Sequence, residues 1–145
     1  MSMIKVLDAA LYPDELESGF GSKHPDDAGI DLRAAIDTKV VAGETAAIPL
    51  GVAVALPIRS MGLVVGRSSA STTRALMIHP GIIDQGYRGV IHGMVTALGA
   101  PVHIARGDRI CQLIIIPIIF PGWTITDDLG ETERGLAGLG STGLK

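Results

Sequence analysis

The sequence is poor in aromatic residues, in charge and in cysteine. Only 3% of its 145 residues are Phe, Trp or Tyr, and 19% are charged. With so few large rings, the core has to be built from Ile, Val, Leu and Ala, a composition that favours strands. A single cysteine, Cys111, excludes an internal disulfide, so we expect a cytoplasmic location, or the interior of a host cell if the protein is viral.

The sequence also lacks a basic surplus and a long hydrophobic run. Its formal net charge is −3, which argues against a general nucleic-acid or anionic-membrane surface, although a few arginines suffice to hold one phosphate group. The longest apolar stretch, residues 110–120, is interrupted by Gln112 and Pro117 and is well short of the ~20 residues needed to span a bilayer. The N-terminus lacks the pattern of a signal peptide. We expect a soluble protein with no nucleic-acid or membrane partner.

Apolar residues make up 47% of the chain, enough for one core. Gly and Pro divide the chain into short pieces, none of which has a convincing helical period over three turns. Many short strands at this spacing predict an all-β sandwich or jelly roll. We expect one domain over residues 1–130 and a flexible C-terminal tail over 131–145. The expected strands lie at residues 3–11, 29–35, 38–42, 45–57, 61–67, 75–79, 89–98, 101–106, 109–120 and 123–127.

Two of these segments are apolar at nearly every position instead of alternating with polar residues. They are residues 50–56 and residues 112–119. Both faces of such strands are expected to be covered, and in so small a domain the second face is most simply covered by another copy of the chain. The pattern therefore predicts a homo-oligomer.

The sequence offers no obvious metal or nucleotide motif. The histidines, His24, His79, His92 and His103, are scattered, and Cys111 has no partner at ligand spacing. No GxxxxGK[ST] phosphate loop is present. Five short polar segments set among apolar strands remain as candidates for chemistry.

The first two polar segments are AGIDLRAA and GRSSAS. Asp31 in the first is an acid between apolar neighbours, which suits an edge position or a partner for a nearby arginine. In the second, Arg67 precedes the hydroxyls of Ser68 and Ser69 directly after an apolar strand. Strand-end amides, hydroxyls and a guanidinium together form an anion-binding nest. Taken alone, an ordinary polar turn is the simpler explanation.

The other three segments are GIIDQGYRG, RGDRICQL and RGLAGLGSTG. The first is predicted to be a tight hairpin with Asp84 at its first turn position, where Asp is favoured for structural reasons alone. Gln112 is the one polar interruption of a long apolar strand, and a buried Gln needs hydrogen-bond partners in the protein or in a ligand. In the last segment Arg134 is followed by glycines, Ser141 and Thr142, which suits either a disordered end or a strap that closes over an anion.

Taken together and in this order, the five segments resemble the five motifs of the homotrimeric dUTPase family, over nearly the whole chain. The matching stretches are Ala28 to Leu32, Arg67 to Ser69, Ile83 to Gly89, Gly107 to Leu113 and Arg134 to Gly143. The resemblance implies a jelly-roll trimer that hydrolyses dUTP to dUMP and pyrophosphate. It also implies three active sites, each made from pieces of all three subunits.

The resemblance further implies a role for each matched residue. Asp84 would be the general base that activates water for attack on the α-phosphate, and would also receive the 3′-hydroxyl of the deoxyribose. Tyr87 would pack against the sugar and exclude a 2′-hydroxyl, while Asp31 would support the phosphate shell. Mg²⁺ is held in this family mainly by the triphosphate and water. The remaining implied contacts are Gly81, Ile82, Ile83 and His92 with uracil, Arg67, Ser68, Ser69 and Gln112 with the phosphates, Arg134 with the γ-phosphate, and Leu139, Gly140, Ser141 and Thr142 in a closing tail.

The chain departs from the family pattern at a few positions. Leu139 stands where an aromatic residue usually stacks on uracil, so stacking worth ~0.5–1.5 kcal/mol is lost. We expect a working enzyme with weaker closure over its substrate. Val90 replaces a common acid, and Ile78 and His79 lie near the position of an Asn that often contacts uracil.

Three other functions are compatible with parts of the sequence. A dCTP deaminase shares the fold and an Arg-Ser-Ser element, but no Asp or Glu occurs from Gln85 to Gly107, where its catalytic Glu is expected. A non-catalytic or regulatory binding protein could keep the dUTPase scaffold, because fold alone does not guarantee the reaction. An unrelated jelly-roll structural or sugar-binding protein would leave the five segments unexplained.

Overall fold

The computed structural model of the chain describes residues 2–20, 26–133 and 135. The expected all-β architecture is confirmed, with two short α-helices and one 3₁₀ turn added in the described ranges. The elements are β1 (Met3–Val6), η1 (Ala9–Leu11), α1 (Pro13–Ser18), β2 (Ile30–Arg33), β3 (Thr38–Val40), β4 (Thr45–Pro49), β5 (Val52–Ala55), β6 (Ser60–Gly66), α2 (Ser68–Arg74), β7 (Leu76–His79), β8 (Gly81–Ile83), β9 (His92–Ala97), β10 (Val102–Ile104) and β11 (Arg109–Pro117).

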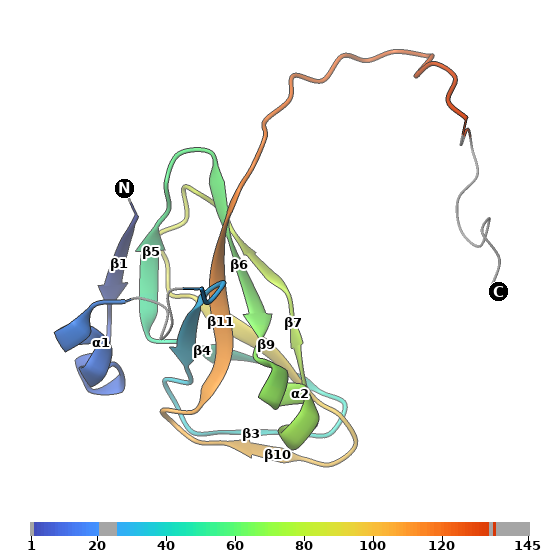
Figure 1. The fold of residues 1–145 in the computed structure, drawn as a ribbon. Coiled ribbons are helices and arrows are strands. Elements are labelled where there is room, and N and C mark those ends of the chain that lie inside the picture. Colours follow the sequence, from blue (N-terminus) through green and yellow to red (C-terminus); the bar gives the residue numbers. More distant parts are fainter. Residues whose placement is uncertain (1, 21–25, 134, 136–145) are drawn as a thin grey trace.

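The strands form the layered sheets of a jelly roll (Figure 1). The four-stranded sheet has the order β2-β11-β6-β8, and a three-stranded sheet has the order β4-β9-β7. Two smaller pairs, β1-β5 and β10-β3, complete the arrangement. Neighbours in these ladders are antiparallel, and strands distant in sequence, such as β2 and β11, lie side by side. This crossing of the chain brings the ends of β2, β6 and β11 together.

Aliphatic side chains between the sheets form the core, as the composition predicts. The largest fully buried ones include Leu32, Ile48 and Ile110, and each contributes about 1.5–3 kcal/mol by leaving water. Tyr12 is the one ring among the fully buried side chains of the described residues, and burial raises its pKa to about 12. Its hydroxyl donates to the Leu50 carbonyl oxygen at 2.6 Å and accepts from the Arg33 backbone N–H at 2.9 Å. Tyr12 therefore ties β2 to the interior.

Several expected strands are shorter than predicted or absent. The stretch 45–57 is two strands, because Gly51 takes a left-handed conformation with φ of 68° and turns the chain. Residues 9–11 form a 3₁₀ turn instead of continuing the first strand. The strand expected at 123–127 is wrong for the single chain, since no neighbouring edge pairs with it in the described structure. Its Trp123 and Ile125 side chains are at least nine-tenths exposed.

The two doubly apolar segments differ in how well the single chain covers them. Val52 and Val54 on β5 are buried, whereas Ile115 on β11 and Ile119 just after it are exposed. From residue 118 the chain runs away from the sheets (Figure 1). In the described part of the chain, no helix has the length and apolar character needed to cross a membrane.

Candidate functional site

Strand register places the first group of candidate residues on one face of the four-stranded sheet. On β11, Gln112 is opposite Asp31 of β2 on one side and opposite Val65 of β6 on the other. Directly opposite residues of an antiparallel pair project to the same face, and Arg67 follows Val65 by two residues. Gly29 permits the close approach of β2 to β11, because a Cβ at this position would lie 2.6 Å from the Leu113 carbonyl oxygen.

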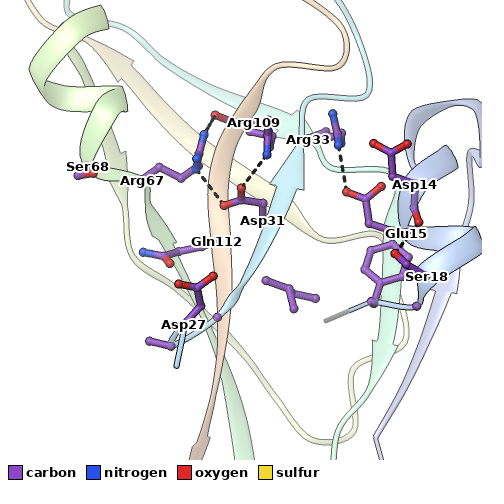
Figure 2. Close-up of a pocket in the computed structure, with 15 residues that line it drawn as sticks. Asp14, Glu15, Ser18, Asp27, Asp31, Arg33, Arg67, Ser68, Arg109 and Gln112 are labelled. Atoms are coloured by element: carbon purple, nitrogen blue, oxygen red, sulfur yellow. Dashed lines mark hydrogen bonds and ion pairs between the residues drawn. The ribbon is translucent and has the colours of Figure 1, made fainter. Parts of the chain in front are cut away.

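Asp31 lies between two guanidinium groups at this face (Figure 2). Its Oδ1 is 2.9 Å from Arg67 Nε, and its Oδ2 is 3.5 Å from Arg109 Nη1. Arg67 also donates from Nη1 to the Arg109 carbonyl oxygen at 3.5 Å. The carboxylate therefore holds the two arginines of neighbouring segments in one place.

These side chains line a cavity of about 950 Å³, which we call the arginine pocket. Helix α1 forms its far wall, where Glu15 pairs with Arg33 of β2 at 3.0 Å (Figure 2). Among the described lining residues, three are arginines and four are acids. The arginines are Arg33, Arg67 and Arg109, and the acids are Asp14, Glu15, Asp27 and Asp31. By formal charge, the described carboxylates of the pocket thus outnumber its guanidinium groups by one.

A second set of contacts fixes the turn that precedes β11. The Asp108 carboxylate accepts a hydrogen bond from Arg74 at the end of α2 and another from the Ala105 backbone N–H at 2.9 Å. The Arg74 guanidinium lowers the pKa of the Asp108 carboxyl below its ordinary value. Ala34, directly after β2, donates its N–H to the Asp108 carbonyl oxygen at 2.8 Å. Asp108 therefore joins α2, β2 and β11, which are three of the segments that line the arginine pocket.

The second candidate region is the turn after β8, residues 84–87, which we call the Asp84 turn. It is closed by the Tyr87 N–H, which donates to the Asp84 carbonyl oxygen at 3.0 Å. The Tyr87 hydroxyl donates to the Val90 carbonyl oxygen at 3.0 Å, and this hydrogen bond restrains the orientation of the exposed ring. Gly89 makes room for it, because a Cβ there would lie 2.4 Å from the Tyr87 hydroxyl oxygen.

The Asp84 carboxylate itself is exposed. Within the described part of the chain it has no hydrogen-bond or ion-pair partner. Asp84 is thus available to a water molecule or ligand, in contrast to Asp31, which two arginines already engage.

The Asp84 turn and the arginine pocket lie at opposite ends of β6. Ile83 is opposite Gly62, five residues before Arg67. At 3.3 Å per residue, the turn is about 16 Å from Arg67 along the strand. None of the turn residues lines the arginine pocket. A ligand that bridges both regions within one chain would have to span this distance.

The structure thus divides the residues predicted from the sequence into two described groups and a third that lies outside the described residues. Asp31, Arg67, Ser68 and Gln112 line the arginine pocket, and Ser69 lies next to it on α2. Gly81, Ile82, Ile83, Asp84 and Tyr87 lie on β8 and its turn, and His92 begins β9. Arg134, Leu139, Gly140, Ser141 and Thr142 are outside the described residues.

The tight hairpin expected at residues 81–89 is only half correct. Asp84 does occupy the first position of a turn. The strands on either side, however, belong to different sheets, because β8 pairs with β6 and β9 pairs with β4 and β7. The chain changes layers at this turn instead of folding back on itself.

Sequence reasoning missed Glu15, Arg33 and Arg109 as pocket residues. Pro13 followed by Asp14 and Glu15 has the composition of a helix start, with Pro in the first turn and acids near the N-terminus. That signal predicts helix α1, although no sequence signal places α1 over the pocket. Arg33 is recognisable as the residue two beyond Asp31, and therefore on the same face of the strand.

The described residues hold no cluster of three or more His, Cys, Asp or Glu that could bind a metal ion directly. Asp31 and Glu15 are engaged by arginines, which leaves little carboxylate charge for a protein-made cage. Mg²⁺ often keeps several waters and is bound by one or two carboxylates together with substrate phosphates. The pocket lining suits a Mg²⁺ ion of that kind, and Asp27 and Asp31 are the carboxylates that would hold it through water.

Three comparisons place this geometry among known proteins. The dUTPase family model matches residues 19–143. The deoxyuridine 5′-triphosphate nucleotidohydrolase of Cutibacterium acnes is 42% identical over 124 residues, which cover 83% of this chain and 82% of that protein. The dUTPase of Staphylococcus bacteriophage 80alpha with dUpNHpp superposes with a TM-score of 0.87 at 26% identity, over 99% of each chain. A variant dUTPase from phage phi11 of S. aureus, described as coordinating a structural Mg(II) ion, has a TM-score of 0.77 at 24% identity and covers 89% of this chain and 98% of its own.

Proposed function

The chain belongs to the dUTPase family, and we propose that its active site joins the arginine pocket of one subunit to the Asp84 turn of another. The enzyme is a dUTP diphosphatase, which hydrolyses dUTP to dUMP and pyrophosphate. This reaction keeps uracil out of DNA and supplies dUMP. The observation that carries the proposal is the separation of the two regions along β6.

A homotrimer completes the site. The backbone separation of about 16 Å along β6 is more than a triphosphate chain spans, which argues against Asp84 serving a phosphate held by Arg67 of its own chain. Exposed apolar side chains, among them Ile115, Ile119 and Trp123, are available to bury against neighbouring subunits. A closed ring of three copies gives three equivalent sites.

Asp84 acts as the general base. An exposed carboxylate without an internal partner orients a water, takes its proton and directs the resulting oxygen at the α-phosphorus. The bond between the α-phosphorus and the oxygen that bridges to the β-phosphate breaks, and pyrophosphate leaves. The same carboxylate receives the 3′-hydroxyl of the deoxyribose, which aligns the nucleotide with the water.

Tyr87 selects the deoxyribose. Its ring is held by the hydroxyl contact to Val90 and by the space above Gly89, so it cannot move away easily from an added 2′-hydroxyl. UTP is therefore refused on steric grounds. Backbone groups of Gly81, Ile82 and Ile83, with His92 nearby, contact the uracil edge; Ile82 is 65% exposed and available for this contact.

The arginine pocket holds the phosphate chain. Arg67 and Gln112 point into it, with Ser68 and Ser69 at the start of α2, and Asp31 keeps Arg67 in position. Because the described acids of the pocket outnumber its arginines, a triphosphate needs further positive charge from elsewhere. Arg134 on the γ-phosphate supplies part of it. Leu139, Gly140, Ser141 and Thr142 close over the nucleotide as the C-terminal tail, residues 131–145, docks.

A Mg²⁺ ion bound with the triphosphate would neutralise charge on the phosphate oxygens. Asp27 and Asp31 of the pocket would hold it through its waters. The chain's own residues then bind, orient and deprotonate, as described above. Deamination of dCTP and a purely regulatory role are not favoured by the family match.

Product analysis tests this function. Purified protein and MgCl₂ are mixed with dUTP, dCTP, dTTP or UTP in separate tubes, and monophosphate, pyrophosphate and ammonia are measured. Hydrolysis of dUTP alone is expected. Ammonia from dCTP, or no reaction with any nucleotide, would refute it, and a sedimentation mass near one chain would refute the shared site.

A further inference from the structure

The turn between β5 and β6 is built around a residue in an unusual conformation. Arg59 has a φ of 58°, in the left-handed region that a non-glycine residue seldom enters. The turn is closed by the Ser60 hydroxyl, which is buried and donates to the Pro57 carbonyl oxygen at 2.8 Å. Backbone strain of this kind persists only where the surroundings determine it, so the turn is a rigid point of the fold.

In this conformation both backbone groups of Arg59 bind segments distant in sequence. Its N–H donates to Oε1 of Gln85 at 2.9 Å. Its carbonyl oxygen accepts from the N–H of Ile118 at 2.9 Å, where the chain leaves β11. The rigid β5–β6 turn therefore holds the side chain of Gln85, the residue that follows Asp84, in a fixed position.

The Asp84 turn has several internal contacts. Arg88 donates from Nη1 to the Gln85 and Tyr87 carbonyl oxygens, at 2.7 and 2.8 Å. These bonds, with the Tyr87 contacts already described, keep the shape of the turn but do not attach it to the rest of the molecule. Within the described part of the chain, the Gln85–Arg59 bond is the one hydrogen bond that joins residues 84–89 to a residue outside the segment 84–90.

We propose that Gln85 is a positioning residue: its side-chain oxygen, held by the Arg59 N–H, sets the place of the Asp84 carboxylate. The inference rests on the proposed role of Asp84 as the base. Asp84 has no partner of its own, so the location of its carboxylate depends on its backbone. Misplacing a catalytic group by even 1 Å costs rate out of proportion to the energy of the lost contact.

Two variants separate the hydrogen bond from the bulk of the side chain. Gln85→Met keeps the length but removes the acceptor, and we expect kcat for dUTP to fall about three- to tenfold, the loss of one ordinary hydrogen bond. Gln85→Glu keeps an Oε acceptor, and its kcat at pH 8 is expected within about twofold of wild type. Lys39→Met, which also introduces methionine but at an exposed site on β3, is the control.

A double variant tests whether Gln85 acts through Asp84. In an Asp84→Asn background, measured by single turnover, Gln85→Met is expected to cause no further loss, because the group that it positions is already gone. The proposal is overturned if Gln85→Met retains wild-type kcat, if Gln85→Glu loses as much as Gln85→Met, or if Gln85→Met lowers both backgrounds equally. Full activity of Asp84→Asn alone would instead refute the assignment of the base, which distinguishes the two failures.

Discussion

The arginine pocket and the Asp84 turn are organised by opposite means. In the pocket, charged side chains from α1, β2 and β11 and from Arg67, the residue after β6, bind one another. Asp31 and Glu15 are each engaged by arginine. In the turn, the ionisable group is unpaired and the backbone around it is held by neutral contacts or by Arg88. The pocket therefore holds its guanidinium groups in fixed positions, whereas the turn leaves its carboxylate unpaired.

The ion pairs of the pocket position its side chains and contribute little to the free energy of folding. Arg67 and Asp31 are each about one-third exposed, and such pairs contribute about 0–1 kcal/mol to folding. Their value lies in holding the guanidinium groups in fixed places before substrate arrives, so that less order is lost on binding. Substitutions in the two regions should therefore affect different kinetic constants.

The largest effect is expected from removing the charge of the Asp84 turn. Asp84→Asn should lower kcat about 10²–10⁴-fold, because the water loses its base. The melting temperature should hardly change, since the side chain is exposed and unpartnered. Pyrophosphate release at saturating dUTP measures the effect, with Glu44→Gln as a control at another exposed acid. An Asn variant that keeps more than about a tenth of the wild-type kcat would contradict the assignment.

A smaller and different effect is expected in the pocket. Arg67→Gln removes a charged hydrogen-bond donor to phosphate. It should raise KM about ten- to a hundredfold and lower kcat by a smaller factor. The rise of KM with added KCl should also become less steep. Lys39→Gln, an exposed cation on β3, is the control. If Arg67→Gln instead lost mainly kcat, the division between binding and chemistry would be wrong.

Two glycine substitutions sharpen the contrast. In Gly29→Ala the new Cβ meets the Leu113 backbone oxygen at 2.6 Å, which should lower the free energy of unfolding by about 1–3 kcal/mol. In Gly89→Ala it meets only the end of the exposed Tyr87 side chain, so stability should persist while the preference for dUTP over UTP falls about tenfold. Denaturant unfolding and kcat/KM for both nucleotides measure the pair. Equal stability losses would contradict the distinction.

The smallest effect concerns pH and the Asp108–Arg74 bond. The pKa of Asp108 is lowered in the folded chain, so the bond stabilises the fold above the unfolded pKa of 3.8 and stops doing so as pH falls through the lower folded value. Asp108→Asn should therefore lower the melting temperature most at neutral pH, and the difference from wild type should shrink below pH 3.8. A difference that grew on acidification would have the wrong sign.

The sequence predicts much of this arrangement, because its signals are local. The apolar runs of β6 and β11, the turn that begins at Asp84 and the order of the polar segments are all recognisable without a structure. Short strands such as β8 are not, since three residues have too little pattern to stand out from a turn. Helix α2 has seven polar or small residues and no apolar face to reveal it.

Which residues meet across the pocket could not be predicted. The pairing of Gln112 with Asp31 depends on the register of two strands about eighty residues apart, and a one-residue slip would reverse the face. The contact of Glu15 with Arg33 depends on the path of the chain after β1. The failed strand at 123–127 teaches the same lesson, because β-propensity without a partner edge forms no sheet.

The most direct test of the shared site is complementation between two inactive variants. Asp84→Asn and Arg67→Gln proteins are each nearly inactive alone at low dUTP; mixed, unfolded and refolded together, they form trimers with random composition. If each site takes Asp84 from one subunit and Arg67 from another, about a quarter of the sites recover both residues and the mixture regains about that share of wild-type activity. If both residues of a site came from one chain, every site would lack one of them, and the mixture would stay as inactive as its components.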